Sequence, residues 1–181
     1  MVHSRDKEML PSLTFVLGGA ASGKSQTAEA IIVNSGLTPV YLATSRIWDD
    51  EIQGKVDVHR ERRGPEWHTI NADRDLGVPL GQAQAGQAIL LDCATMWLTN
   101  VIMDDQDIKT AQNDLLFALR TCDAPVVVVS NEVGQGIVPD NALARQFREA
   151  QGRLNIALAA QADCVLHVVA GLTRVLKGDA P

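Results

Sequence analysis

Short apolar runs recur along the chain, and segments with helical spacing of apolar residues separate them. Runs that predict buried strands lie at residues 13–17, 40–43, 88–92, 125–130 and 164–170, with a weaker candidate at 67–70. We interpret 164–170 as the final clear strand. Because the strands read as continuous apolar runs rather than alternating ones, they predict a parallel sheet that is covered on both faces.

Helices are predicted between these strands. Residues 26–33 follow the first strand, and a polar segment, 49–63, carries only Ile52 and Val56 as an apolar stripe. Ala111, Leu115 and Leu119 recur at helical spacing, and a long amphipathic segment covers residues 143–158. Residues 73–87 are rich in Gly, Ala and Gln and predict no definite element. The order of elements indicates an α/β protein in which ligands bind at the carboxyl ends of the strands.

Length and composition narrow the class of protein. The chain has 181 residues, of which 46% are apolar and 21% charged. We expect a leader at residues 1–12 and a single domain at 13–181. The net charge of −6 argues against a broad nucleic-acid surface. No window has the apolar length of a membrane span, no apolar signal core is present, and the three cysteines form no C-x-x-C pair. We therefore expect a cytoplasmic protein without a membrane span.

The stretch GGAASGKS matches the phosphate-binding loop pattern of P-loop NTPases. It consists of Gly18, Gly19, Ala20, Ala21, Ser22, Gly23, Lys24 and Ser25. The glycines let backbone amides converge on a phosphate, at the start of a helix whose dipole favours anions. A Gly-rich turn with a surface lysine is the alternative, but the strand before the loop and the helix after it favour nucleotide binding.

Asp92 ends an apolar strand, as the acidic residue of a Walker B element does. With Ser25 it would hold Mg²⁺, which prefers oxygen ligands. Alternatively, Asp92 caps the next helix.

His59 lies within a charged stretch, between two aspartates with a glutamate and a group of arginines. A neutral imidazole is a competent nucleophile toward phosphorus, and guanidinium groups neutralise phosphate charge. A solvated surface histidine is the alternative from composition alone. His3, His68 and His167 show no partner pattern for a metal site.

Several stretches together resemble one family throughout residues 13–177. They are GGAASGKS, YLATS, DDE…H…R…W-x-T, LLDC…WLTN, SNEVGQGIVP-x-N-x-LAR-x-FR and GRLN…LAAQAD-x-V. The chain is similar to the bifunctional adenosylcobinamide kinase/adenosylcobinamide-phosphate guanylyltransferases of cobalamin biosynthesis. The run that begins at Asn131 is far more specific than the phosphate loop.

The resemblance implies two reactions. A nucleoside triphosphate, ATP or GTP, phosphorylates adenosylcobinamide; GMP then passes from GTP through a GMP-histidine to adenosylcobinamide phosphate. His59 matches the family's histidine, and Lys24 serves the kinase step. The resemblance also implies a homotrimer. Besides the phosphate loop, the stretches that it implies contact nucleotide comprise Thr44, Ser45, Arg46, Arg60, Glu61, Arg62, Arg63, Asn71 and Asp92.

Two positions depart from the family pattern. Ala21 stands where many members carry Arg, and Asn71 stands where a Glu often follows the W-x-T element.

Three other functions remain open from the residues: a monofunctional small-molecule kinase, a GTP-binding switch protein and a RecA-like motor. The absence of an Asn-Lys-x-Asp guanine element weighs against the switch, and the net charge weighs against the motor.

Overall fold

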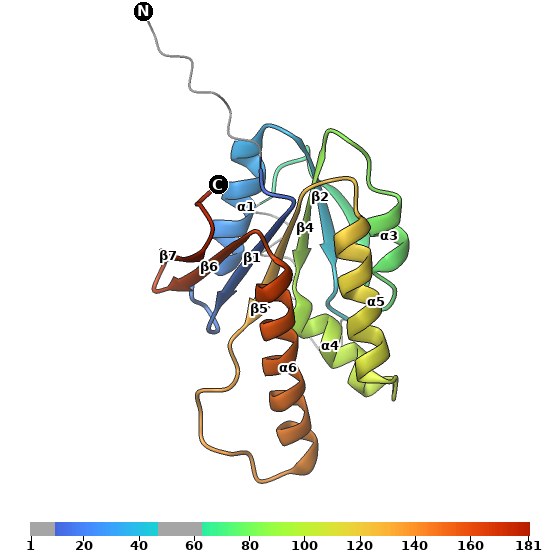
Figure 1. Cartoon of the computed structure of the whole chain (residues 1–181), viewed down its shortest axis with the longest axis vertical. Coiled ribbons are helices and arrows are strands. Elements are labelled where there is room, and N and C mark those ends of the chain that lie inside the picture. The colour runs from blue at the N-terminus through green and yellow to red at the C-terminus, as the bar shows by residue number, and fades with distance from the viewer. Residues whose placement is uncertain (1–9, 47–62) are drawn as a thin grey trace, which may run out of the picture.

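The computed structural model describes residues 10–46 and 63–181. In that part of the chain, seven strands form one sheet in the order β3-β2-β4-β5-β1-β6-β7 (Figure 1). The strands are β1 (Leu13–Gly18), β2 (Thr38–Ala43), β3 (His68–Asn71), β4 (Gln87–Asp92), β5 (Val126–Asn131), β6 (Cys164–Val169) and β7 (Leu172–Lys177). All neighbours pair parallel except β6 and β7, which are antiparallel.

Helices cover both faces of the sheet, as the apolar runs predict. They are α1 (Lys24–Ser35), α3 (Gly77–Gly81), α4 (Ala94–Met103), α5 (Ile108–Thr121) and α6 (Ala142–Gln161). One apolar cluster joins α1 to the sheet through Val16, Ala28 and Ile32. The other lies on the opposite face and includes Phe15 together with Leu154 of α6. Figure 1 shows α5 and α6 lying along that second face. The mostly parallel α/β sheet is therefore confirmed.

The order of the strands places β5 between β1 and β4. Gly18 at the end of β1 pairs with Asn131 at the end of β5, and Asp92 at the end of β4 pairs with Val129. The phosphate loop and the acidic strand end therefore lie at the same edge of the sheet, with one strand between them.

Most predicted strands and helices are present, with ends that differ by one to a few residues. The helix predicted at 49–63 lies outside the described residues except for Arg63. The segment without a prediction, 73–87, contains the short helix α3. At the predicted leader, Leu10 packs against the α1-side core, and the Ser12 carbonyl accepts a hydrogen bond from Val126 N.

The final clear strand predicted at 164–170 is present as β6, but a further strand that was not predicted follows it. A tight turn at Ala170 and Gly171, both with positive φ, returns the chain as β7. All six residues of β7 are exposed, so the strand carries no burial pattern that the sequence could reveal. Lys177 on β7 donates to the carbonyls of Ala159 and Ala160 near the end of α6.

Candidate functional site

The phosphate loop follows β1 and leads directly into α1, as predicted. A Cβ at Gly18 would lie 2.5 Å from both Ser22 Oγ and the Val168 carbonyl, so only glycine fits there. Gly23 has a φ of 97° and precedes the first residue of α1. These glycines let the backbone pass between β6 and the helix without a side chain in the phosphate position.

The turn between β6 and β7 supports the loop from outside. Gly171 N donates to the Ser22 carbonyl at 2.8 Å. A Cβ at Gly23 would lie 3.1 Å from Gly171 Cα, so the two glycines approach closely. The sequence gives no signal for this contact, because β7 itself was not predicted.

Lys24 and Ser25 occupy the first turn of α1. Lys24 is 8% exposed, and its ammonium donates to the Gly19 carbonyl at 3.0 Å. Its charge therefore lies over the loop, beside the helix N-terminus that favours anions. Ser25 is partly buried one residue further along.

Asp92 lies on the face of the sheet that α1 covers. Its register partner Val129 belongs to the apolar cluster on the α1 side, and register partners in a parallel pair share a face. The Tyr41 hydroxyl donates to the Asp92 carbonyl at 3.4 Å. Burial, and then the charge of Asp92, raises the pKa of Tyr41, while Arg63 lowers it. A carboxylate thus ends β4 on the same face as Ser25.

The donors at this edge fit Mg²⁺. The Ser25 hydroxyl and the Asp92 carboxylate are both oxygen ligands, and Mg²⁺ in phosphate sites takes one or two protein oxygens together with phosphate and water. No group of three or more His, Cys, Asp or Glu that could hold a metal occurs among the described residues. The edge of the sheet therefore suits a cation that a bound nucleotide completes.

Thr44 is fully buried just beyond β2. Its hydroxyl donates to the Cys93 carbonyl and accepts from Cys93 N, both at 2.8 Å. Asn100 donates to the Thr44 carbonyl. Thr44 thus links the ends of β2 and β4, so the structure gives its side chain a bridging role. Ser45 follows, partly buried.

Arg46 is held by two carboxylates. Its Nε donates to Asp73 Oδ2 at 2.6 Å, and its two terminal nitrogens donate to the two carboxylate oxygens of Asp104. These hydrogen bonds hold the pKa of Asp104 below its usual range. The guanidinium therefore joins the chain after β2 to the ends of β3 and α4, and a nucleotide contact by Arg46 stays a prediction.

Arg63 is the one predicted arginine of the basic stretch that the structure describes. Its guanidinium carbon lies 3.4 Å from the centroid of the Tyr41 ring, and Nη1 lies 3.9 Å from Glu29 Oε1. The side chain is 5% exposed. Stacking on the ring and a carboxylate compensate for burying the charge. Arg63 thus anchors the chain just after the stretch that contains His59.

Of the remaining predicted site residues, the structure describes only Asn71. His59, Arg60, Glu61 and Arg62 lie outside the described residues. Asn71 ends β3, pairs with Ala43, and is exposed. The structure therefore brings the phosphate loop and Asp92 together, and the histidine stays a prediction.

Beyond the predicted residues, a buried polar cluster lies behind the end of β5. It consists of Thr95, Ser130, Gln151 and Asn155, which we call the β5 network. Ser130 and Gln151 are fully buried. Polar residues within otherwise apolar segments give little signal of such contacts in a single sequence.

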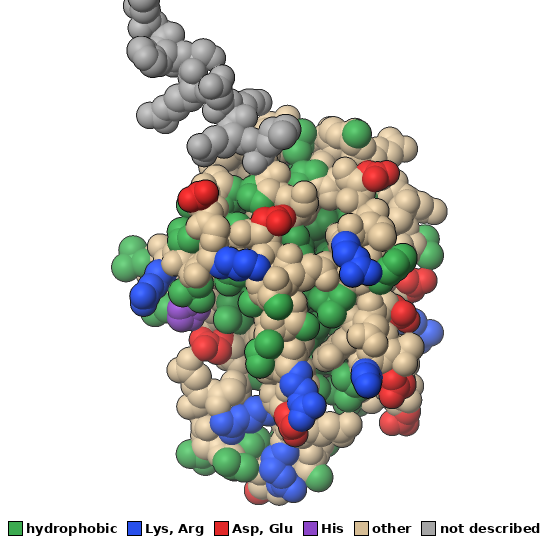
Figure 2. Space-filling model, viewed as in Figure 1, with side chains coloured by type: hydrophobic (Ala, Val, Ile, Leu, Met, Phe, Trp, Pro, Cys, Tyr) green, Lys and Arg blue, Asp and Glu red, His purple; other side chains and the backbone are tan. Residues whose placement is uncertain are grey.

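A groove of about 430 Å³ lies between α6 and the loop that precedes it. Figure 2 shows basic side chains on this part of the surface, and Arg145, Arg148 and Arg153 line the groove. Arg145 donates to the carbonyls of Pro139 and Asp140, and Arg148 donates to those of Ile137 and Gly134. These arginines hold the loop on the helix.

The sheet order, the phosphate loop and the acidic end of β4 define a nucleotide-binding protein of the P-loop NTPase class. Solved structures agree on the fold alone. The flagellar accessory protein FlaH from Methanocaldococcus jannaschii has a TM-score of 0.51 at 11% identity and covers 94% of this chain and 80% of its own. The PH0250 protein from Pyrococcus horikoshii has a TM-score of 0.55 at 6% identity, covering 95% and 89%.

Within this class, the chain belongs to the CobU family, described as cobinamide kinase / cobinamide phosphate guanyltransferase, whose model matches residues 14–176. The bifunctional adenosylcobalamin biosynthesis protein CobP of Pseudomonas aeruginosa is 38% identical, covering 91% of this chain and 96% of its own. CobU of Escherichia coli is 38% identical and CobU of Salmonella typhimurium 40%, each covering 88% of this chain and 97% of its own. The resemblance predicted from the motifs is confirmed. No described helix is long and apolar enough to cross a membrane.

Proposed function

We propose that the protein phosphorylates adenosylcobinamide with ATP or GTP and then transfers GMP from GTP to the product through His59. The match to the family over residues 14–176 carries this proposal. The shared edge of Gly18–Ser25 and Asp92 supports it, because residues suited to hold phosphate and a metal ion lie there.

In the kinase step, the hydroxyl of adenosylcobinamide attacks the terminal phosphorus of the nucleotide, and the bond to the bridging oxygen breaks. The loop amides and Lys24 hold the phosphates in line and stabilise the charge that shifts to the leaving diphosphate. Ser25 and Asp92 would hold Mg²⁺, which would further neutralise the phosphate charge. The hydroxyl proton leaves to solvent or to a nearby base.

In the transfer step, an unprotonated ring nitrogen of His59 attacks the α-phosphorus of GTP, and pyrophosphate leaves. A phosphate oxygen of adenosylcobinamide phosphate then attacks the same phosphorus and releases the imidazole. The covalent route divides one displacement into two. Arg60, Arg62 and Arg63 are the proposed cations along this path, and Arg63 also anchors the segment through Tyr41.

Labelling with GTP that carries a radioactive α-phosphate tests this proposal. The wild-type protein is expected to take up label that is acid-labile and base-stable, as a phosphoramidate is. His59→Asn should take up none and should form no GDP-linked corrinoid, while its phosphorylation of adenosylcobinamide persists at least in part.

His68→Asn is the matched control, because His68 is an exposed histidine at the start of β3. This variant should label normally. Labelling of His59→Asn at the wild-type level, or peptide mapping of the GMP to another residue, would show that the assignment is wrong.

We further propose a homotrimer in the cytoplasm. Exposed apolar side chains support the assembly: Ile137 is 94% exposed and Leu172 is 76% exposed. Three free cysteines suit a reducing compartment.

A further inference from the structure

The end of β5 is held by side chains from two helices. Asn131 N donates to Thr95 Oγ1 of α4 at 2.8 Å, and the Asn131 carbonyl accepts from Asn155 Nδ2 of α6 at 3.1 Å. Side chains from two helices therefore hold both the backbone N–H and the backbone carbonyl of Asn131. These contacts fix the backbone of Asn131 at the end of β5, beside the phosphate loop.

The β5 network extends this support. Ser130 Oγ donates to Asn155 Oδ1 at 2.7 Å, and Gln151 Nε2 donates to both Ser130 Oγ and Asn155 Oδ1 at 2.9 Å. Gln151 is fully buried, and its Oε1 has no hydrogen-bond partner in the part of the chain that the structure describes. Burying such a group costs stability. The network contacts Asn131 through Asn155, which accepts from Gln151 and donates to the Asn131 carbonyl.

The side chain of Asn131 points to the phosphate side of the sheet. Asn131 pairs with Gly18, the first residue of the phosphate loop, and adjacent strands lie about 4.8 Å apart. Side chains alternate along a strand, and Val127 and Val129 belong to the cluster that packs on α1. Asn131 therefore faces the same side, beyond Val129, which pairs with Asp92.

The amide of Asn131 is available to a ligand. It is partly exposed, and it makes no hydrogen bond within residues 10–46 and 63–181. It stands between the strand that leads to Lys24 and the strand that ends at Asp92. A neutral NH₂ group there can donate to a phosphate oxygen that lies between the lysine and the metal.

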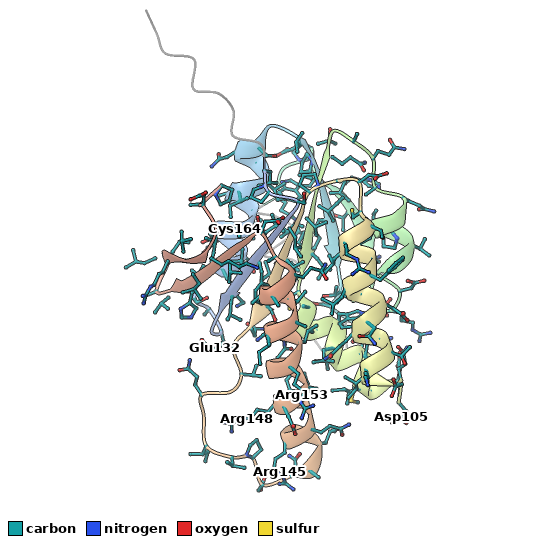
Figure 3. All side chains as sticks on the ribbon, viewed as in Figure 1. Asp105, Glu132, Arg145, Arg148, Arg153 and Cys164 are labelled. Carbon is teal, nitrogen blue, oxygen red and sulfur yellow. The ribbon has the colours of Figure 1, made fainter. Side chains whose placement is uncertain are left out.

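The neighbouring Glu132 is directed elsewhere. Its backbone N donates to the Gly18 carbonyl, which continues the ladder, but its carboxylate lies 3.3 Å from His167 Nε2 and accepts from Gln135 at 2.6 Å. Figure 3 shows Glu132 where the chain leaves β5 for the loop. Because successive side chains alternate, its carboxylate lies on the opposite face from Asn131.

We infer that Asn131 is a further residue of the kinase site, whose amide donates a hydrogen bond to the γ-phosphate of the bound nucleotide. The β5 network positions it and does not itself contact the nucleotide. This inference rests on nucleotide binding at the phosphate loop, but not on the identity of the acceptor that the proposed function names.

Binding of a diphosphate and of a non-hydrolysable triphosphate tests the contact without any acceptor. Calorimetry with Mg²⁺ would compare ADP with β,γ-imido-ATP, and GDP with β,γ-imido-GTP. The wild-type protein should prefer the triphosphate. Asn131→Ala should lose about tenfold of that preference, the scale of one charge-assisted hydrogen bond, with diphosphate affinity unchanged. Asn131→Asp should lose more, because a carboxylate repels the phosphate.

Asn113→Ala, on the exposed face of α5, is the control and should keep the wild-type preference. Gln151→Met keeps the shape of the side chain but removes its donors, so it should lower the preference for triphosphate without changing diphosphate affinity. A merely structural role would instead lower the melting temperature and leave the preference intact.

A wild-type preference retained within twofold by Asn131→Ala would overturn the inference, as would a wild-type protein without any preference. If Asn131→Ala does not fold by circular dichroism, Asn131→Ser in the same assay decides. A protein that shows the predicted preference but phosphorylates no adenosylcobinamide would contradict the proposed function and leave the inference standing.

Discussion

The place of Asp92 in the fold could be predicted from the sequence around it. The apolar run before it predicts a buried strand, and the structure places the residue at the end of β4 on the side of α1. The polypeptide also turns there through a cis peptide between Asp92 and Cys93. Ser25 lies in the first turn of the helix that covers the same face, so both oxygens are on the side of the sheet where Mg²⁺ is predicted to bind.

We therefore expect Asp92→Asn to raise the Mg²⁺ concentration needed for half-maximal kinase activity by about tenfold or more, because the carboxylate is the charged ligand of the pair. Titrating Mg²⁺ at saturating nucleotide measures the change. Asp114→Asn, an exposed position on α5, is the matched control. An unchanged Mg²⁺ dependence of Asp92→Asn would favour a helix-capping role instead.

Residues whose partners are distant in sequence could not be interpreted in the same way. The carboxylates that hold the Arg46 guanidinium belong to Asp73 and Asp104, which are 27 and 58 residues away, and a nucleotide contact by Arg46 stays a prediction. Asn131 ends a strand that the sequence predicts well, but the contacts that hold it come from α4 and α6. Only the folded chain brings such side chains together.

At the scale of elements, continuous apolar runs made the central strands predictable. β1, β4 and β5 are buried nearly throughout, and apolar residues fill most of their positions. β7 is exposed throughout and follows the turn at Gly171, so its sequence carries no continuous buried run. A strand can be predicted from its sequence when it is buried. β7, in the edge hairpin that supports the phosphate loop, is not buried.

Arg46, Asp73 and Asp104, which we call the Arg46 cluster, join the chain after β2 to the ends of β3 and α4. This cluster should make the stability of the fold depend on pH. The Asp104 pKa is lowered in the folded protein, so the folded state binds fewer protons than the unfolded state in acid. The contribution of Asp104 to the free energy of unfolding is therefore complete above the usual aspartate pKa of about 4. It is lost as the pH falls through the lower pKa of the folded protein.

Arg46→Met should accordingly be less stable than wild type at neutral pH, and the difference should shrink as the pH falls below about 4. Urea unfolding at a series of pH values measures it. Arg120→Met, on the exposed surface of α5, should show a difference that does not change with pH. A difference for Arg46→Met that stays constant to pH 3 would contradict a charge-dependent role for the cluster.

At the scale of the whole molecule, two segments of the described chain each carry a pair of strongly exposed apolar side chains. One is the loop before α6, where Ile137 and Val138 are 94% and 73% exposed. The other is β7, where Leu172 and Leu176 are 76% and 53% exposed. An exposed edge strand that carries leucines is prone to association.

A cyclic trimer requires two different surfaces on each subunit, because each contact in the ring is head to tail. The two segments meet that requirement, and we expect them to face each other across the subunit boundary. Leu172→Asp/Leu176→Asp and Ile137→Asp/Val138→Asp should therefore each dissociate the proposed trimer to monomers, since a buried carboxylate opposes either side of the same contact.

Light scattering after size exclusion measures the mass of each variant, and circular dichroism checks that it remains folded. Mixing the two variants provides the sharper test, because each then supplies the surface that the other has lost. One intact contact forms in the mixture, so its mass should rise toward a dimer. Val78→Asp, at an exposed valine on α3, is the control and should keep the wild-type mass. A wild-type monomer would contradict the trimer, and a trimer that survives either double substitution would show that its contacts lie elsewhere.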